Sequence, residues 1–276
     1  MTENKDVLAA IHQREAAFFD EMALEILTQT KSEQEQILYV DVDSALRNYP
    51  DHYRYAYSIL GDLNGKSVLD MGCGSGKSCI ILAKKGASVR AFDISPESIK
   101  VANLRAEINR VGGQVKVERM TAEKMDYESG CFHLVFGVGI LHHVNMKIAA
   151  AEISRVMREK GEAVFIEPIA FSPLLRRIRH SSLVRWMVPN KGKDLVITED
   201  ERQLYPRDID DFRPYFSVVE YKPFQLFSRL DRLIGGYPVR RNYRLIAWIN
   251  AFDRFLLDRY PFFSRFGRWG VIHLRK

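Results

Sequence analysis

The chain has 276 residues, of which 46% are hydrophobic and 28% are charged. This is an ordinary globular composition, and it supplies enough apolar side chains for a large core that needs no stabilising metal or disulfide. The three cysteines, Cys73, Cys79 and Cys131, match no zinc-ligand spacing, so we expect reduced thiols and no bound metal. Neither an apolar signal segment at the N-terminus nor a run of about 18 apolar residues is present, which favours a cytoplasmic protein without a spanning helix.

The formal net charge of +6 is unevenly distributed along the chain. Residues 1–170 contain 20 Lys and Arg against 24 Asp and Glu, whereas residues 171–276 contain 21 against 11. The basic C-terminal part could face an acidic substrate, a membrane surface or nucleic acid, or it could be a solvated face without a partner.

The apolar pattern changes near Lys66. Residues 1–64 have apolar side chains at helical spacing and lack strand alternation, which predicts a helical N-terminal segment. Beyond Lys66, short apolar runs alternate with helical stretches, and this order predicts an α/β fold with a parallel sheet covered on both faces. The predicted strands span residues 67–70, 89–93, 115–119, 132–138, 163–167, 216–221 and 269–274, and the predicted helices span residues 78–85, 96–111 and 148–157.

Beyond Pro168 the pattern weakens. Residues 176–188 are basic and amphipathic. Residues 225–266, between the last two predicted strands, are rich in arginine and aromatic residues and predict a helical insertion.

The strongest motif is D-M-G-C-G-S-G over residues 70–76, directly after the first predicted strand. Alternate glycines permit a sharp turn and let a ligand lie against bare backbone, while the following helix directs its N–H groups toward that ligand. A dinucleotide-binding loop would read G-x-G-x-x-G. Here the third glycine comes one residue early, and the acid Asp70 favours a cationic group over a phosphate.

Asp93 ends the second predicted strand, which places it at the same edge of the sheet as the glycine loop. A carboxylate at this position can accept hydrogen bonds from both hydroxyls of a ribose. The alternative is a helix-capping Asp, although Ser95 already supplies a cap for the helix that follows.

In this order and spacing, the motifs resemble those of the class I, Rossmann-like S-adenosylmethionine-dependent methyltransferases that act on small molecules. The resemblance covers about residues 60–170 and rests on five segments: residues 68–76, 92–96, 122–125, 132–144 and 155–168. It implies a Rossmann-like, mostly parallel seven-stranded sheet flanked by helices, with S-adenosylmethionine as the cofactor.

The resemblance also implies cofactor contacts at the ends of successive strands. The glycine loop would hold the methionine and ribose, with Asp70 steering the amino group. Asp93 would bind the ribose, Ile94 would pack on the adenine, and Ala122 and Glu123 would reach the adenine edge. The expected cofactor-binding residues are Asp70, Gly72, Cys73, Gly74, Gly76, Asp93, Ile94, Ala122, Glu123, Gly137 and Val138.

Three side chains are candidates for catalysis: His142, His143 and Glu167. Either histidine could take a proton from an acceptor hydroxyl near neutral pH, or one could pack on the cofactor while the other bonds the loop. Glu167 could position an acceptor hydroxyl or amine, or be structural. His133 stands where the family usually has an acid, and we expect it to be structural.

These assignments divide the chain into three parts. We expect a helical lid over residues 1–64, a cofactor-binding core over residues 65–168, and a C-terminal part over residues 169–276 that completes the sheet and contributes acceptor-side helices. Aromatic and apolar side chains outside the core predict a small, apolar or aromatic acceptor, methylated on oxygen or nitrogen. Those singled out are Phe18, Phe19, Tyr39, Tyr49, Tyr53, Leu174, Trp186, Phe224, Phe227, Tyr237 and Trp248.

Several alternatives stay open at this point. A nucleic-acid substrate is disfavoured because residues 137–140 read G-V-G-I rather than an N-P-P-Y-type sequence that grips a planar amine. Residues 225–266 mix cations with aromatic residues, as interfacial helices do, so the acceptor could be a membrane-associated lipid or quinone-like molecule. A non-catalytic cofactor-binding protein and an NAD-dependent dehydrogenase are the remaining alternatives, and the oligomeric state is left open.

Overall fold

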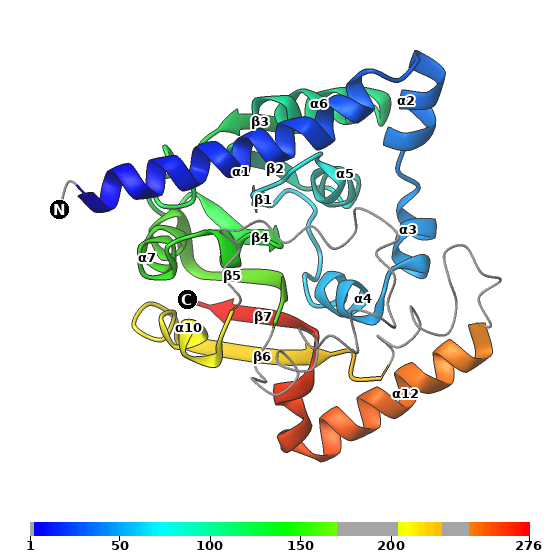
Figure 1. Cartoon of the computed structure of the whole chain (residues 1–276), viewed down its shortest axis with the longest axis vertical. Coiled ribbons are helices and arrows are strands. Elements are labelled where there is room, and N and C mark those ends of the chain that lie inside the picture. The colour runs from blue at the N-terminus through cyan, green and yellow to red at the C-terminus, as the bar shows by residue number, and fades with distance from the viewer. Residues whose placement is uncertain (1–2, 170–203, 228–242) are drawn as a thin grey trace, which may run out of the picture.

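The computed structural model describes residues 3–169, 204–227 and 243–276. Seven strands form one sheet in the order β3-β2-β1-β4-β5-β7-β6 (Figure 1). Strands β1 to β5 run parallel, and β7 is antiparallel to both β5 and β6. This arrangement confirms the predicted seven-stranded, mostly parallel sheet. The strands are β1 (Ser67–Met71), β2 (Ser88–Asp93), β3 (Val115–Arg119), β4 (Phe132–Val138), β5 (Met157–Pro168), β6 (Val218–Phe224) and β7 (Trp269–Arg275).

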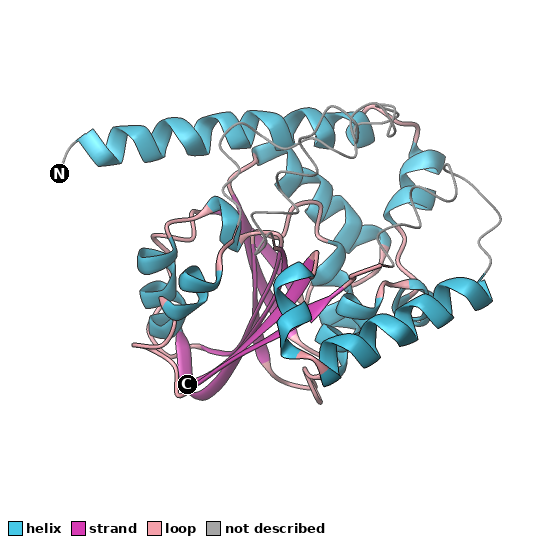
Figure 2. Cartoon of the chain, turned by 60° about the horizontal axis from the view of Figure 1, so that its bottom comes forward, coloured by secondary structure: helices cyan, strands magenta, loops and turns pink. Residues whose placement is uncertain are grey.

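Helices lie on both sides of the sheet (Figure 2). They are α1 (Glu3–Leu27), α2 (Lys31–Leu38), α3 (Val42–Asn48), α4 (Asp51–Ser58), α5 (Lys77–Lys84), α6 (Pro96–Ile108), α7 (Met146–Val156), α10 (Pro206–Asp210) and α12 (Tyr243–Arg259), with 3₁₀ turns η1 (Leu141–His143) and η4 (Pro261–Phe266). Buried side chains of α4, α5 and α6 pack with Phe136 on one face, and those of α7 and α10 pack with Val135 on the other. Adjacent residues of β4 thus serve opposite cores, as the pleat of a strand requires.

Local sequence signals explain where the helices around the site begin. Helix α6 starts at Pro96, and the hydroxyl of its N-cap residue Ser95 accepts a hydrogen bond from the Ser98 N–H at 2.9 Å. Helix α5 starts directly after Gly76, whose left-handed φ of +77° turns the chain from strand to helix.

Two strands differ from the predicted bounds by more than one residue. Strand β5 begins at Met157 rather than at residue 163, because Met157 pairs with Phe132 before a register shift brings Glu162 opposite Leu134. Strand β6 begins at Val218 rather than at residue 216, because the ring of Phe216 turns into the core against Phe212.

The N-terminal segment is helical, as predicted, and its first helix lies along α6 (Figure 1). Ala23 of α1 and Leu38 of α2 pack against Val101 of α6 in a small apolar cluster. The carboxylate of Asp20 accepts hydrogen bonds from the Ser95 hydroxyl at 2.6 Å and the Glu97 N–H at 3.0 Å. Helix α1 is therefore bonded to the start of α6, at the carboxyl end of β2.

The insertion contains the helices α12 and η4 before β7, whereas its described residues 225–227 are not helical. The basic segment at residues 176–188 and the first part of the insertion, residues 228–242, lie outside the described residues. Within the parts of the chain that are described, no helix is both long enough and apolar enough to cross a membrane.

Candidate active site

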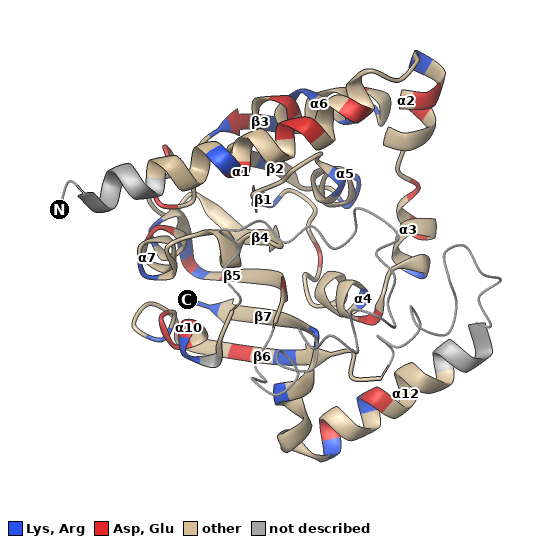
Figure 3. Ribbon diagram, viewed as in Figure 1, with Lys and Arg blue, Asp and Glu red and all other residues tan. Residues whose placement is uncertain are grey.

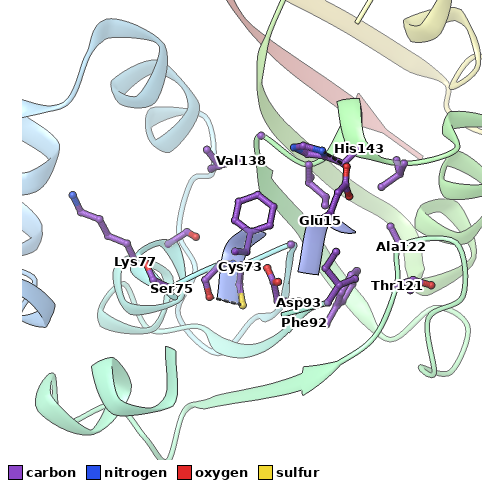
Figure 4. Close-up of a pocket in the computed structure, with 18 of the residues that line it drawn as sticks. Glu15, Cys73, Ser75, Lys77, Phe92, Asp93, Thr121, Ala122, Val138 and His143 are labelled. Carbon is purple, nitrogen blue, oxygen red and sulfur yellow. Dashed lines mark hydrogen bonds and ion pairs between the residues drawn. The ribbon is translucent and has the colours of Figure 1, made fainter. Parts of the chain in front are cut away.

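A cavity of about 360 Å³ lies at the carboxyl ends of the first four strands (Figure 4). Its walls come from α1, from the tyrosines of α4 and the turn before it, and from the loops that follow β1, β2, β3 and β4. Most of the predicted cofactor-binding residues line it: Gly72, Cys73, Gly74, Asp93, Ile94, Ala122, Glu123 and Val138. The sheet thus brings together residues that are up to 66 positions apart in the chain.

The glycines of the loop serve two purposes. Gly76 is required by packing, because a Cβ on it would lie 2.9 Å from the Ala102 Cα in addition to the strain of its positive φ. Gly74 has a φ of +50°, and a Cβ on it would meet no atom within 4 Å among the described residues. Gly74 therefore presents bare backbone to the cavity, where a ligand can approach closely.

Asp93 holds the glycine loop and faces the cavity at the same time. Its Oδ2 accepts a hydrogen bond from the Gly74 N–H at 2.8 Å, and its Oδ1 accepts one from the Ser95 N–H at 2.9 Å. Burial raises the pKa of this carboxyl, while its backbone hydrogen bonds oppose the rise. A carboxylate has about four lone-pair positions in total, so these contacts leave acceptor capacity for hydroxyl groups of a ligand.

Three predicted cofactor-binding residues lie behind the cavity wall: Asp70, Gly76 and Gly137. Asp70 is buried and accepts a hydrogen bond from the Cys79 thiol at 3.0 Å, and burial raises its pKa to about 6. Gly137 is close-packed, since a Cβ on it would lie 2.8 Å from Phe165 Cδ1. These residues shape the loop and the strand end from beneath rather than line the cavity.

Glu123, at the end of the cavity near β3, carries an acceptor without a hydrogen-bond partner. Its Oε1 accepts from the Asn145 N–H at 2.9 Å, whereas its buried Oε2 has no hydrogen bond among the described residues. The nearest cation is His12 of α1, whose Nε2 lies 3.5 Å from Oε2. The Glu123 carboxylate raises the pKa of His12. Burial alone would raise the pKa of Glu123, but the interactions with His12 and the Asn145 N–H are together stronger, so the Glu123 pKa is lowered.

The three candidate catalytic residues separate into two groups. Glu167 is 0% exposed; its Oε1 accepts from the N–H groups of Ile140 and Leu141, and its Oε2 lies 2.8 Å from His142 Nδ1. Glu167 and His142 therefore hold the η1 turn in place and do not line the cavity. His143 does line it, and its Nδ1 lies 2.6 Å from Oε1 of Glu15 on α1 (Figure 4).

His133 lies at the opposite end of β4, far from the cavity lining. Its Nδ1 accepts a hydrogen bond from the Ser67 N–H at 3.0 Å, and its Nε2 lies 2.5 Å from Arg158 Nη1. These contacts join β4 to the start of β1 and to β5, which is a structural role.

The aromatic wall of the cavity comes mainly from the N-terminal segment. Tyr49, Tyr53 and Tyr57 line it together with Phe19. Tyr49 stacks on Tyr53 with ring centroids 4.7 Å apart, and the Lys77 ammonium lies 4.8 Å above the Tyr49 ring.

The other side chains singled out for the acceptor pocket lie elsewhere. Phe18, Tyr39, Phe224, Phe227 and Trp248 do not line the cavity. Leu174, Trp186 and Tyr237 lie outside the described residues.

Sequence reasoning missed His12 and Glu15. They lie on a helix whose amphipathic pattern gives no sign of which polar side chains reach the sheet edge. Their pairing with Glu123 and His143 spans more than 100 residues of chain. A sequence signal for these pairs would have required knowledge of where α1 docks.

Comparisons with known proteins agree with this geometry. A family model described as "Methyltransferase domain" matches residues 69–165. A ubiquinone biosynthesis O-methyltransferase of Paraburkholderia xenovorans is 34% identical over 118 residues, which cover 42% of this chain and 48% of that protein. A protein of the same name from Pseudomonas paraeruginosa is 29% identical over 188 residues, covering 66% of this chain and 74% of that one. The chain thus spans about half the length of the first of these relatives and three quarters of the second.

A solved structure shares the fold over nearly the whole chain. The geranyl diphosphate C-methyltransferase of Streptomyces coelicolor superposes with a TM-score of 0.60 at 12% identity, covering 96% of this chain and 97% of that one. Residues 69–165 thus match a methyltransferase domain, and the chain shares the fold of a solved S-adenosylmethionine-dependent methyltransferase, so it is similar to the class I, Rossmann-like members of that group.

Proposed function

We propose that this protein transfers the methyl group of S-adenosylmethionine to a hydroxyl of a small, apolar or aromatic acceptor. One observation carries the proposal: a single cavity joins the glycine loop and Asp93 to His143 and to a wall of aromatic rings. The glycine loop and Asp93 suit a nucleoside with a cationic tail, whereas His143 and the aromatic wall suit an apolar molecule that must lose a proton.

The residues present fit the cofactor. Asp93 has acceptor capacity for ribose hydroxyls, and Gly74 offers backbone without a side chain in the way. Oε2 of Glu123, which lies 3.5 Å from His12 Nε2 and has no hydrogen bond among the described residues, provides an acceptor for an amino group on a purine edge. When bound, S-adenosylmethionine supplies a methyl carbon that is already electrophilic.

The chain's own contribution is alignment, exclusion of water and removal of a proton. Phe19 and the tyrosines of α4 and its preceding turn form an apolar wall that can hold a planar acceptor in one orientation. Holding two reactants in line can supply about 7–11 kcal/mol of the barrier reduction. His143 is a titratable side chain of the cavity lining that can accept a proton from an acceptor hydroxyl.

The names of the relatives support oxygen as the methylated atom. The proteins of Paraburkholderia xenovorans and Pseudomonas paraeruginosa are both ubiquinone biosynthesis O-methyltransferases. An acceptor that consists of an aromatic ring with a hydroxyl matches the aromatic wall and the histidine of this cavity.

A methyl-transfer assay tests the proposal. The protein is incubated with S-adenosylmethionine and matched pairs of small phenols and anilines, and both S-adenosylhomocysteine and methylated product are measured by mass spectrometry. We expect O-methyl ethers in equal amount to S-adenosylhomocysteine. Turnover confined to the anilines would contradict methylation on oxygen, and absence of product with every phenol would contradict the proposed acceptor class.

We further propose that the protein reaches an apolar acceptor at a membrane surface through α12 and η4. Trp248, Phe255 and Phe262 are 68%, 58% and 59% exposed, and the Arg265 guanidinium lies over the Phe262 ring. The half of α12 nearer η4 carries two Asp and two Arg, and Arg265 of η4 adds a further cation (Figure 3). Exposed aromatic side chains beside cations are typical of interfacial helices, which favour anionic lipid.

Vesicle flotation tests this membrane contact. We expect the protein to float with vesicles containing anionic phospholipid, and a double variant, Trp248→Ser with Phe255→Ser, to remain in the dense fraction. Tyr215→Ser, at an exposed aromatic residue distant in sequence from α12, is the matched control. Equal flotation of the double variant and the wild type would refute the role of this surface.

A further inference from the structure

We infer that Glu15 of α1 is a positioning residue that orients His143 for proton abstraction, so that the base is complete only when α1 is seated over the cavity. The inference rests on the proposed function, because it concerns how the acceptor hydroxyl loses its proton. It assigns a chemical role to the N-terminal helix, which otherwise serves only as a wall.

Glu15 and His143 form a close pair. Oε1 of Glu15 lies 2.6 Å from Nδ1 of His143, and Glu15 is 3% exposed (Figure 4). The Phe19 ring, one turn further along α1, meets the His143 ring edge-on with centroids 6.0 Å apart. Two side chains of α1 therefore fix the plane of this imidazole.

The pairing selects the tautomer of His143. An ionised carboxylate only accepts hydrogen bonds, so Nδ1 must carry the proton that bridges to Glu15. The lone pair of the neutral ring then resides on Nε2, which has no hydrogen-bond partner among the described residues. His143 lines the cavity, so Nε2 is the nitrogen available to an acceptor hydroxyl.

A second histidine–carboxylate pair in the same loop provides an internal comparison. His142 and Glu167 have a similar Nδ1-to-oxygen distance of 2.8 Å, and the two imidazole rings lie 4.0 Å apart. Glu167, however, is occupied by the backbone N–H groups of η1, and neither member of that pair lines the cavity. Of these two pairs, only Glu15 with His143 reaches the place where an acceptor would lie.

Helix α1 is attached to the sheet edge at three places. His12 lies against Glu123 after β3, Glu15 against His143 after β4, and Asp20 against Ser95 after β2. These contacts set the position of Glu15 over the cavity. Since Glu15 and His143 are 128 residues apart, their alignment depends on this docking and not on local structure.

The step balances as follows. The acceptor oxygen forms a bond to the methyl carbon while the carbon–sulfur bond breaks, and the electron pair of that bond stays on sulfur. The hydroxyl proton moves to Nε2 of His143. The Glu15 carboxylate then stabilises the imidazolium cation, which is the usual work of a carboxylate behind a catalytic histidine.

The test compares Glu15→Gln with Glu21→Gln, a change of the same chemistry at an exposed position on α1. Each is assayed with an ordinary phenol and with an acidic nitrophenol that is already ionised at the assay pH. With the ordinary phenol we expect kcat of Glu15→Gln to fall about 10- to 100-fold, as for a weakened general base, and Glu21→Gln to match the wild type. With the nitrophenol we expect both variants to be within about 3-fold of the wild type, because no proton must be removed.

Equal losses of kcat with both phenols would overturn the inference, because they would mark Glu15 as structural. Wild-type activity of Glu15→Gln with both phenols would overturn it as well. Should Glu15→Gln not fold, His143→Gln must show the same dependence on acceptor acidity, and a loss independent of acidity contradicts the inference. Failure of the proposed function itself is distinguishable, since the wild type would then methylate neither phenol.

Discussion

Replacing Asp93 by Asn removes one carboxylate oxygen at the point where the ribose is expected to bind. Asp93 accepts hydrogen bonds from the Gly74 and Ser95 N–H groups through separate oxygens, so the amide can serve only one of them. A hydrogen bond to a charged group contributes about 1.5–3 kcal/mol. Loss of one ribose contact of this strength weakens S-adenosylhomocysteine binding about 10- to 150-fold. The backbone N–H that loses its acceptor is left unsatisfied, and this is expected to lower the free energy of unfolding by about 1–3 kcal/mol.

Calorimetry with S-adenosylhomocysteine and chemical denaturation measure the two effects of Asp93→Asn separately. Asp126→Asn, at an exposed residue of the loop after β3, is the matched control and should change neither quantity. An affinity of Asp93→Asn within about 3-fold of the wild type, well below the loss expected for one charged hydrogen bond, would refute the ribose-binding role. A loss of affinity that follows only the unfolded fraction would refute it too.

Two further changes test the loop and the core. Gly74→Ala should lower the free energy of unfolding by about 1–2 kcal/mol because of the positive φ alone, and it should also weaken cofactor binding. Gly76→Ala should lower the free energy of unfolding more, because its Cβ meets the Ala102 backbone. A larger loss of stability for Gly74→Ala than for Gly76→Ala in urea unfolding would contradict this. Burial lowers the pKa of His52 to about 3, so between that value and about pH 6.5 the unfolded chain binds a proton that the folded chain does not, and stability falls as the pH falls. His52 should therefore account for about 2 kcal/mol of the fall in the free energy of unfolding between about pH 8 and pH 5, and His52→Phe should abolish that part of the fall. The same pH dependence of the free energy of unfolding in His52→Phe and the wild type would contradict this.

Much of the sheet, and the gathering of the glycine loop and Asp93 at one cavity, was predictable because the signals are local. The glycine loop, Asp93 and the Ala122–Glu123 pair each lie at or within a few residues of a strand end, and parallel strands bring their carboxyl ends to one edge. Phe136 and its neighbours form a strand that is apolar on both faces, which itself indicates a buried central strand. Each of these inferences needs only a few consecutive residues.

The acceptor side was less predictable because it depends on long-range docking. Glu167 ends a strand at the mouth of the sheet, so its position suggested an acceptor contact. Its carboxylate instead meets backbone N–H groups of η1, whose direction no side-chain pattern reveals. Glu15 had no distinguishing context at all, since its partner is set by where α1 crosses the sheet edge.

Isothermal titration calorimetry of the wild-type protein with S-adenosylhomocysteine and, separately, with NAD tests the central claim most directly. The early third glycine, the Asp93 carboxylate and the Glu123 carboxylate together predict saturable, one-to-one binding of S-adenosylhomocysteine and no heat with NAD. Saturable binding of NAD with no heat from S-adenosylhomocysteine would contradict the account.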